Sequence, residues 1–192
     1  PLRGDDVILG AQYRTAPNGR GFLPDRQMHK TGYELLLEQG RVIADFAERR
    51  ENIRRQVEQQ AQGLKARAVI DDDLLDEVTG LVEWPIAHCG RFEERFLAVP
   101  QEALVSAMQE HQKYFPVVDD RGRLLPYFIF VANLGSRDPQ QIIEGNERVI
   151  RPRLADAAFF YETDRKTSLQ SRRERLKTIV YQEQLGTLWD KT

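Results

Sequence analysis

Cysteine is nearly absent from this 192-residue chain, which has a single thiol at Cys89. One thiol cannot build a disulfide framework or a thiolate metal cluster, and this favours a reducing, cytosolic setting. The apolar neighbours of Cys89 predict a strand over residues 86–89, in which a free cysteine behaves as a small hydrophobic residue. We therefore expect Cys89 to be buried and reduced.

Long apolar runs and an excess of charge of one sign are also missing. No run approaches the roughly 18 apolar residues of a membrane-spanning helix, and no signal-peptide pattern opens the chain. The 28 basic and 30 acidic residues leave a formal net charge of −2. Proteins devoted to polyanions are usually basic overall, so contact with nucleic acid would require a local basic patch. These features predict a soluble, cytoplasmic protein.

The sequence lacks the motifs of nucleotide-dependent and metal-dependent catalysis. It has neither the Gly-x-x-x-x-Gly-Lys-Ser/Thr phosphate loop nor the Gly-x-Gly-x-x-Gly pattern. The three histidines, His29, His88 and His111, are far apart, and no local set of side chains converges as metal ligands would. We predict no catalytic residue and no metal site in this chain.

What is present is the composition of an ordinary globular protein, with 41% hydrophobic and 30% charged residues. Strands mixed with helices, without strict alternation, predict an α+β or mixed α/β fold. We expect a mixed α/β domain over residues 1–135 and a helical segment over 136–192. Because the chain opens without methionine and stops within a helical pattern, we expect an excised piece of a longer protein.

Local patterns predict the following elements. They are a hairpin over 7–23, helices over 32–62 with a break near Gly40, a helix starting after Asp71-Asp72-Asp73, a strand over 86–89, a helix over 101–112, strands over 114–118 and 127–132, helical structure over 138–161, and a final helix from Ser171 to the C-terminus. The strand over 127–132 is apolar at nearly every position, so both of its faces should be covered. Pro152 should produce a bend or a junction between two helices.

Charged clusters have simple structural explanations in the first half of the chain. The aspartates at 71–73 should cap the helix that follows them. Four arginines, Arg49, Arg50, Arg54 and Arg55, should form a solvated helix face among neighbouring glutamates.

A local basic patch exists between residues 147 and 177, where nine basic side chains face five acidic ones. Arg148 and Arg151 lie within one helical turn of each other, so their guanidinium groups could straddle phosphates. The alternative is that these arginines pair with acidic neighbours or with another domain. The consecutive aromatics at 159–161 cannot all face one core, so at least one should lie against another domain or a partner.

Four longer strings are more specific than these patterns. They are 72–75 (DDLL) with 82–85 (VEWP), 111–117 (HQKYFPV) with 124–129 (LLPYFI), 145–157 (GNERVIRPRLADA), and 182–192 (QEQLGTLWDKT). In this order and spacing, from about residue 41 onward, the chain resembles the β subunit of bacterial heterotetrameric glycyl-tRNA synthetase.

That resemblance implies a division of labour between subunits. The α subunit of this family carries the class II catalytic core, which uses ATP, Mg²⁺ and glycine, and the β subunit supports activity and contributes to tRNA binding. The part covered here is similar to the editing-type domain of the phenylalanyl-tRNA synthetase β subunit. It lacks the family's C-terminal helical and anticodon-binding domains.

We therefore expect a non-catalytic part of the ligase, inactive alone, with the α subunit, tRNA-Gly and a second β subunit as partners. The candidate tRNA-binding residues are Lys113, Arg148, Arg151, Arg153, Arg172 and Arg173. One alternative is an assembly module that never touches RNA. The other is an editing hydrolase, which is weaker because fold kinship does not carry function and the chain offers no nucleophile or activated-water site.

Overall fold

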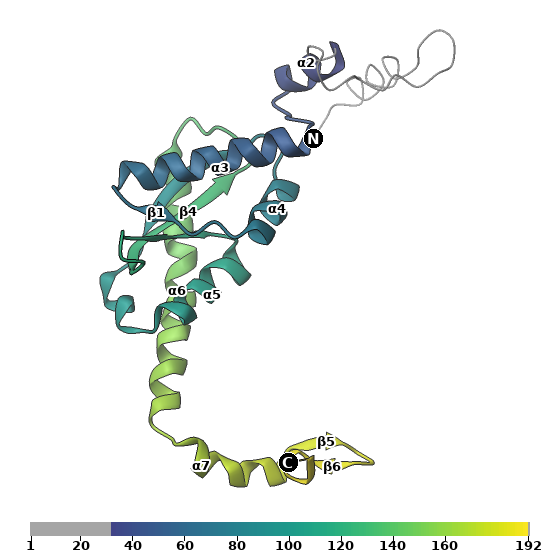
Figure 1. Cartoon of the computed structure of the whole chain (residues 1–192), viewed down its shortest axis with the longest axis vertical. Coiled ribbons are helices and arrows are strands. Elements are labelled where there is room, and N and C mark those ends of the chain that lie inside the picture. Colours follow the sequence, from purple (N-terminus) through teal and green to yellow (C-terminus); the bar gives the residue numbers. More distant parts are fainter. Residues whose placement is uncertain (1–31, 192) are drawn as a thin grey trace.

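A four-stranded antiparallel sheet forms the centre of the molecule (Figure 1). The computed structural model describes residues 32–191, so the hairpin predicted over 7–23 lies outside the described residues. The strand order is β1-β3-β4-β2. The strands are β1 (Arg67–Ala68), β2 (Ile86–Arg91), β3 (Phe115–Val118) and β4 (Leu124–Ala132). The prediction of a mixed fold with helices and strands is confirmed.

Helices surround this sheet and extend beyond it. The helices up to residue 165 are α2 (Gly32–Gln39), α3 (Phe46–Gly63), α4 (Asp72–Leu81), the 3-10 helix η1 (Glu94–Ala98), α5 (Gln101–Gln112) and α6 (Pro139–Arg165). The predicted break near Gly40 is confirmed, since residues 40–45 are not helical. No helix of the described part is long and apolar enough to cross a membrane.

Both faces of β4 are covered, as its apolar sequence predicts. Neighbouring side chains of a strand point to opposite faces. Ile129 therefore packs with helices α3 and α4, while Phe128 and Phe130 pack with α5 and α6. The fully buried large apolar residues of these helices are Ile53 and Val57 of α3, Leu75 of α4, Leu104 and Met108 of α5, and Ile150 and Leu154 of α6.

Helix starts follow the sequence closely. Asp71 accepts a hydrogen bond from the N–H of Leu74 at 3.0 Å, which confirms the predicted cap of α4. Asp45 caps α3 in the same way, through the N–H of Glu48 at 2.8 Å. Aspartate is favoured at these positions because the first turn of a helix leaves N–H groups unpaired.

Gly90 of β2 lies opposite Phe128 of β4 in the strand register. A Cβ atom at position 90 would lie only 2.5 Å from Cζ of the Phe128 ring. That separation is far inside van der Waals contact, so any side chain at position 90 would displace a fully buried ring.

Side chains from both helical layers bond to backbone groups near the two ends of the outer edge of β2. Gln56 of α3 donates to the carbonyl of Pro85 at 2.9 Å and accepts from the N–H of Ala87 at 2.9 Å. At the other end of β2, Glu147 of α6 accepts from the N–H of Arg91 at 2.9 Å. Open edge strands invite pairing with other chains, and these contacts occupy backbone groups near both ends of β2 that such pairing would use.

Helix α6 continues through Pro152. Of the two expected outcomes at this residue, a bend or a junction between two helices, the junction is therefore wrong. Pro152 removes the N–H that would bond to the carbonyl of Arg148, but Pro152 is exposed and lies opposite the buried residues Ile150 and Leu154. The lost hydrogen bond is on the solvent side, where water replaces it at low cost.

The predicted final helix from Ser171 onward is wrong. The chain instead forms α7 (Leu169–Arg172), the 3-10 helix η2 (Arg173–Thr178), the hairpin of β5 (Val180–Gln182) and β6 (Gly186–Thr187), and α8 (Leu188–Lys191). Gly186 has φ +84, a conformation that ends any helix and suits glycine. Asp190 accepts from the N–H and hydroxyl of Thr187 at 2.7 Å each, so α8 starts anew. Figure 1 shows these elements beyond the end of α6, away from the sheet.

Candidate nucleic-acid interface on helix α6

Helix α6 carries three of the candidate arginines and is fixed to the sheet by polar and apolar contacts. Asn146 accepts a hydrogen bond from the hydroxyl of Tyr114 at 2.6 Å, and its amide donates to the carbonyl of Ile142 at 2.8 Å. Burial raises the pKa of Tyr114 to about 12, so the hydroxyl remains a donor at neutral pH. The string from Gly145 to Ala157 therefore contains the residues that anchor this helix.

The three arginines of α6 do not form one continuous surface. Arg151 pairs through Nε with Glu93 at 2.8 Å, at the start of η1. Arg148 and Arg153 are exposed, and neither forms an ion pair with a residue of the described part. Five helical positions correspond to a rotation of about 140° at 3.6 residues per turn, so Arg148 and Arg153 point in divergent directions.

The other three candidates already have partners within the chain. Lys113, in a left-handed conformation with φ 58, ends α5, and its ammonium group lies 2.8 Å from Glu77. Arg172 pairs with Asp164 at 2.8 Å, and the guanidinium of Arg173 lies 4.7 Å from the Trp189 ring centroid. Contact of any of the six with tRNA stays a prediction.

A cavity of about 310 Å³ lies between β2, η1 and α6. Its charged lining consists of Arg91, Glu93, Glu94, Glu147 and Arg151. Glutamates outnumber arginines here, so the cavity is a poor match for a phosphate. Within residues 32–191 no group of three or more His, Cys, Asp or Glu side chains is placed to hold a metal ion.

Two side chains on β2 have shifted pKa values. The pKa of His88 is lowered by burial, and its Nε2 has no hydrogen-bond partner among the described residues. Cys89 is only partly buried, which corrects the expected full burial, because β2 is an outer strand. Burial, and secondarily the charge of Glu147, raise the pKa of the Cys89 thiol to about 11. The thiol pKa of Cys89 is therefore raised, whereas that of a reactive thiol is depressed. The Nε2 atom of His88 is not paired with a nucleophile among the described residues.

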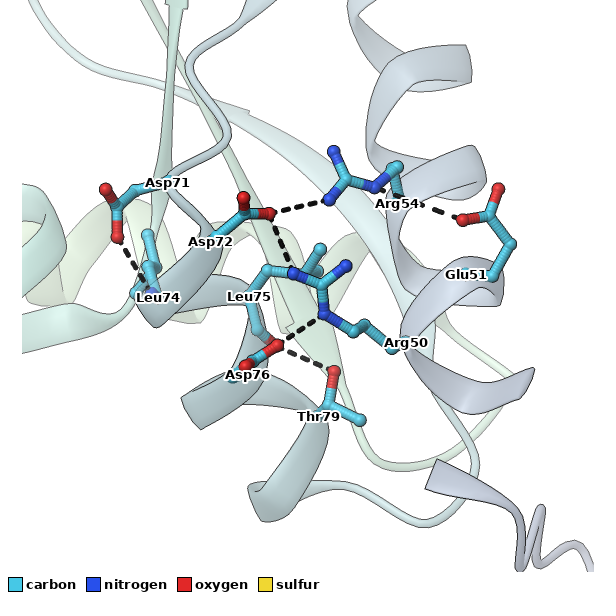
Figure 2. Close-up of polar contacts among 9 residues, drawn as sticks. All are labelled: Arg50, Glu51, Arg54, Asp71, Asp72, Leu74, Leu75, Asp76 and Thr79. Atoms are coloured by element: carbon cyan, nitrogen blue, oxygen red, sulfur yellow. Dashed lines mark hydrogen bonds and ion pairs between the residues drawn. The ribbon is translucent and has the colours of Figure 1, made fainter. Parts of the chain in front are cut away.

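A cluster of basic and acidic side chains between α3 and α4 was missed by the sequence reasoning (Figure 2). Arg50 bonds to Asp72 at 2.7 Å and also to Asp76, and Arg54 bonds to Asp72 at 2.8 Å. The hydrogen bond from Arg50, and then that from Arg54, lower the pKa of Asp72. The expectation of a purely solvated arginine face is wrong for these two residues, although Arg54 also lies 4.0 Å from Glu51.

Arg49, the neighbour of this cluster, has a structural role as well. It donates from Nε to the carbonyl of Thr79 at 3.0 Å and from Nη1 to that of Ile43. A usable signal was present in the sequence, because Arg50 and Arg54 share a spacing of four with Asp72 and Asp76, which places each pair on one helix face.

Comparison with known proteins gives a consistent result. Residues 10–192 match the family described as Glycyl-tRNA synthetase beta subunit. The chain is 56% identical over 197 residues to the Glycine--tRNA ligase beta subunit of Chromohalobacter salexigens, covering 99% of this chain and 29% of that protein. It is 63% identical over 165 residues to the protein of the same name from Marinobacter nauticus, covering 83% of this chain and 23% of that protein. The chain thus spans less than a third of the length of these relatives.

Proposed function

Because this chain belongs to the glycyl-tRNA synthetase beta subunit family, we propose that it is a non-catalytic part of a glycine–tRNA ligase, supporting glycyl-tRNA aminoacylation through tRNA binding and domain positioning. The family match over residues 10–192 carries this proposal. The whole enzyme would be a class II synthetase of the cytoplasm. Its ATP and Mg²⁺ would be bound by the α subunit, and its partners would be that subunit, tRNA-Gly and a second β subunit.

The tRNA contact in this proposal is made to phosphates. Arg148 and Arg153 are exposed on α6 and free of ion pairs within residues 32–191. Arginine at such a position binds phosphate through its planar fork of N–H donors. Contacts of this kind position an RNA without reading its sequence.

The test replaces Arg148, Arg151 and Arg153 by glutamine in the complete α/β enzyme. Each lost phosphate contact should reduce the slope of log affinity against log salt by about 0.7–0.9. The weakening should be similar for tRNA-Gly and for an unrelated tRNA. Arg121→Gln, in the exposed turn between β3 and β4, is the matched control and should leave the slope unchanged.

A second candidate function follows from the internal partners of the other candidates. Lys113, Arg151 and Arg172 each form an ion pair within the chain, as an assembly module without RNA contact would have. If the folded triple variant keeps the original salt slope and loses thermal stability, the phosphate hypothesis is wrong and the assembly module becomes the preferred function.

We also propose that the fold is related to the editing-type domain of phenylalanyl-tRNA synthetase, without the editing chemistry. The isolated chain should show no glycine-dependent ATP–pyrophosphate exchange and no deacylation of mischarged tRNA-Gly. Deacylation by the folded chain that disappears on heat denaturation would restore the hydrolase alternative.

A further inference from the structure

The last part of the chain lacks a core of its own. We define residues 155–191 as the distal segment. Ile150 and Leu154 are fully buried, but no described residue after Leu154 is buried. Beyond α6 the segment consists of two four-residue α-helices, a six-residue 3-10 helix, and strands of three and two residues. Elements this short are marginal in water without packing against something else.

The distal segment also exposes much apolar surface. Seven of the fourteen large apolar side chains that are exposed in the described part lie within it. Leu169 is 88% exposed, Val180 65%, and Phe159 63%. Half of the exposed large apolar side chains thus fall in less than a quarter of the described residues, and such a concentration favours an interaction site over single, scattered exposure.

The chemistry of this surface favours a protein over an RNA. Leu169, Val180 and Leu185 are aliphatic and cannot stack on bases. Two of its rings are covered by cations, since Lys177 lies 4.5 Å from the Trp189 centroid and Lys191 lies 4.1 Å from that of Tyr181. Phe159 and Phe160 are exposed and contact each other edge-on, with centroids 5.7 Å apart and no cation of the described residues over either ring. RNA-binding surfaces place accessible rings beside free cations, whereas here the cations lie on Trp189 and Tyr181, and the other exposed side chains are mostly aliphatic.

We propose that the distal segment is a docking surface for the remainder of the same β-subunit polypeptide. The relatives are more than three times as long as the matched region, so most of a β subunit lies outside this chain. A covalently linked surface has an effective concentration in the millimolar range, which favours it over a second copy or another subunit. The complementary surface, on the remainder of the polypeptide, is apolar and carries carboxylates that face the exposed cations Lys166 and Arg175 of the distal segment. This inference rests on family membership and not on tRNA contact.

The experiment uses the complete β subunit that contains this sequence, without α subunit and without tRNA. Leu169→Cys and Val180→Cys are alkylated, and the rates are read peptide by peptide against the denatured protein. Arg121→Cys, in the polar turn between β3 and β4, shows that the reagent reaches a folded surface. We expect both distal cysteines to react at least about tenfold more slowly than Arg121→Cys, at every protein concentration. Hydrogen exchange of the unsubstituted subunit over 155–191 should show the same protection.

Each other outcome overturns the proposal. Equal rates at all three cysteines with fast hydrogen exchange over 155–191 would show an uncovered surface. Protection that disappears on dilution would assign the surface to a second copy. Protection absent from the β subunit alone would assign the surface to the α subunit if it appears when that subunit is added, and to RNA if it appears when tRNA is added. The tRNA salt slope can fail while the protection stands, so the two proposals fail separately.

Discussion

The hydroxyl of Tyr114 lies 2.6 Å from the side-chain oxygen of Asn146, joining the start of β3 to the middle of α6. Two strings quoted separately from the sequence, 111–117 and 145–157, thus meet in space. Tyr114 also stacks on Phe128, with ring centroids 4.7 Å apart. The two strings are therefore halves of one packing contact between the sheet and α6.

Tyr114→Phe should lower the free energy of unfolding by about 1 kcal/mol, because the partly buried amide oxygen of Asn146 loses its donor while the ring keeps its packing. Asn146→Ala should be non-additive with it in a double-mutant cycle. Urea unfolding measures both. Tyr127→Phe is the matched control, since its hydroxyl makes no hydrogen bond with the described residues, and it should stay within about 0.5 kcal/mol. Additive effects of Tyr114→Phe and Asn146→Ala would contradict the contact.

Gly90→Ala should destabilise the fold by about 1–3 kcal/mol, because the new methyl group overlaps the Phe128 ring. The loss should shrink in a Phe128→Leu background, where the ring is gone. Gly80→Ala in α4 is the control, since nothing lies within 4 Å of its new Cβ. There the substitution should raise helix stability by up to about 1 kcal/mol. Equal costs of Gly90→Ala in both backgrounds would refute the steric explanation.

The Cys89 thiol should be alkylated slowly at pH 8. Its pKa of about 11, against an ordinary 9.0, lowers the reactive thiolate fraction about 100-fold. The rate should climb with pH until about pH 11. Glu147→Gln should speed labelling at pH 8, because it removes a nearby negative charge that raises the thiol pKa. Stoichiometric labelling of the native wild-type protein within the time of a free thiol would be incompatible with this placement.

Asp72→Asn should weaken the fold at neutral pH and have no effect in strong acid. Hydrogen bonds from Arg50 and Arg54 lower the folded pKa of Asp72 below its ordinary 3.8, so its ionised form stabilises the folded state. That stabilisation is present above pH 3.8 and is lost as the pH falls below it, when the folded carboxyl also binds a proton. Denaturant midpoints of the two proteins, compared across pH, measure the loss.

Asp73→Asn provides the comparison for that series, because Asp73 shares the first turn of α4 but has no ion pair within residues 32–191. Added salt should reduce the Asp72 effect more than the Asp73 effect, since exposed ion pairs are screened. A pH-independent difference for Asp72→Asn would exclude the ionic explanation.

Local signals in the sequence predicted most of the sheet and its helices. Asp71 at the start of α4 and the continuous apolar run of β4 depend on neighbours in sequence, so their reading needed no tertiary information. The helix at 139–165 is indicated by the spacing of Ile150 and Leu154, whereas Pro152 indicates a bend or a junction between two helices. The same spacing places Pro152 opposite Ile150 and Leu154, on the solvent side, where a proline need not divide the helix, so this part of the result was readable from the sequence.

Contacts between distant segments could not be predicted in the same way. For Arg151 the sequence leaves phosphate contact and an internal ion pair open, and it cannot name the partner Glu93, which lies 58 positions away and is brought near by the packing of η1 on α6. The partner choices of Arg50 and Arg54 likewise follow from how α3 and α4 pack. The hairpin at 180–187 failed for a different reason, because its short strands have almost no buried face to create a pattern.

The two contacts on the outer edge of β2, made by Gln56 and Glu147, become available at different times during synthesis. Gln56 precedes β2 in the chain, so the end of the strand near Ala87 has its partner as soon as β2 leaves the ribosome. Glu147 follows β2 by 56 positions, so the N–H of Arg91 at the other end waits for α6. Until β4 has emerged, β2 also lacks its ladder partner, and afterwards the Arg91 end of its outer edge stays open until Glu147 arrives. Unpaired edges are where partly folded chains associate. The growing chain is therefore most open to misassociation after β2 has emerged and before the middle of α6 has followed.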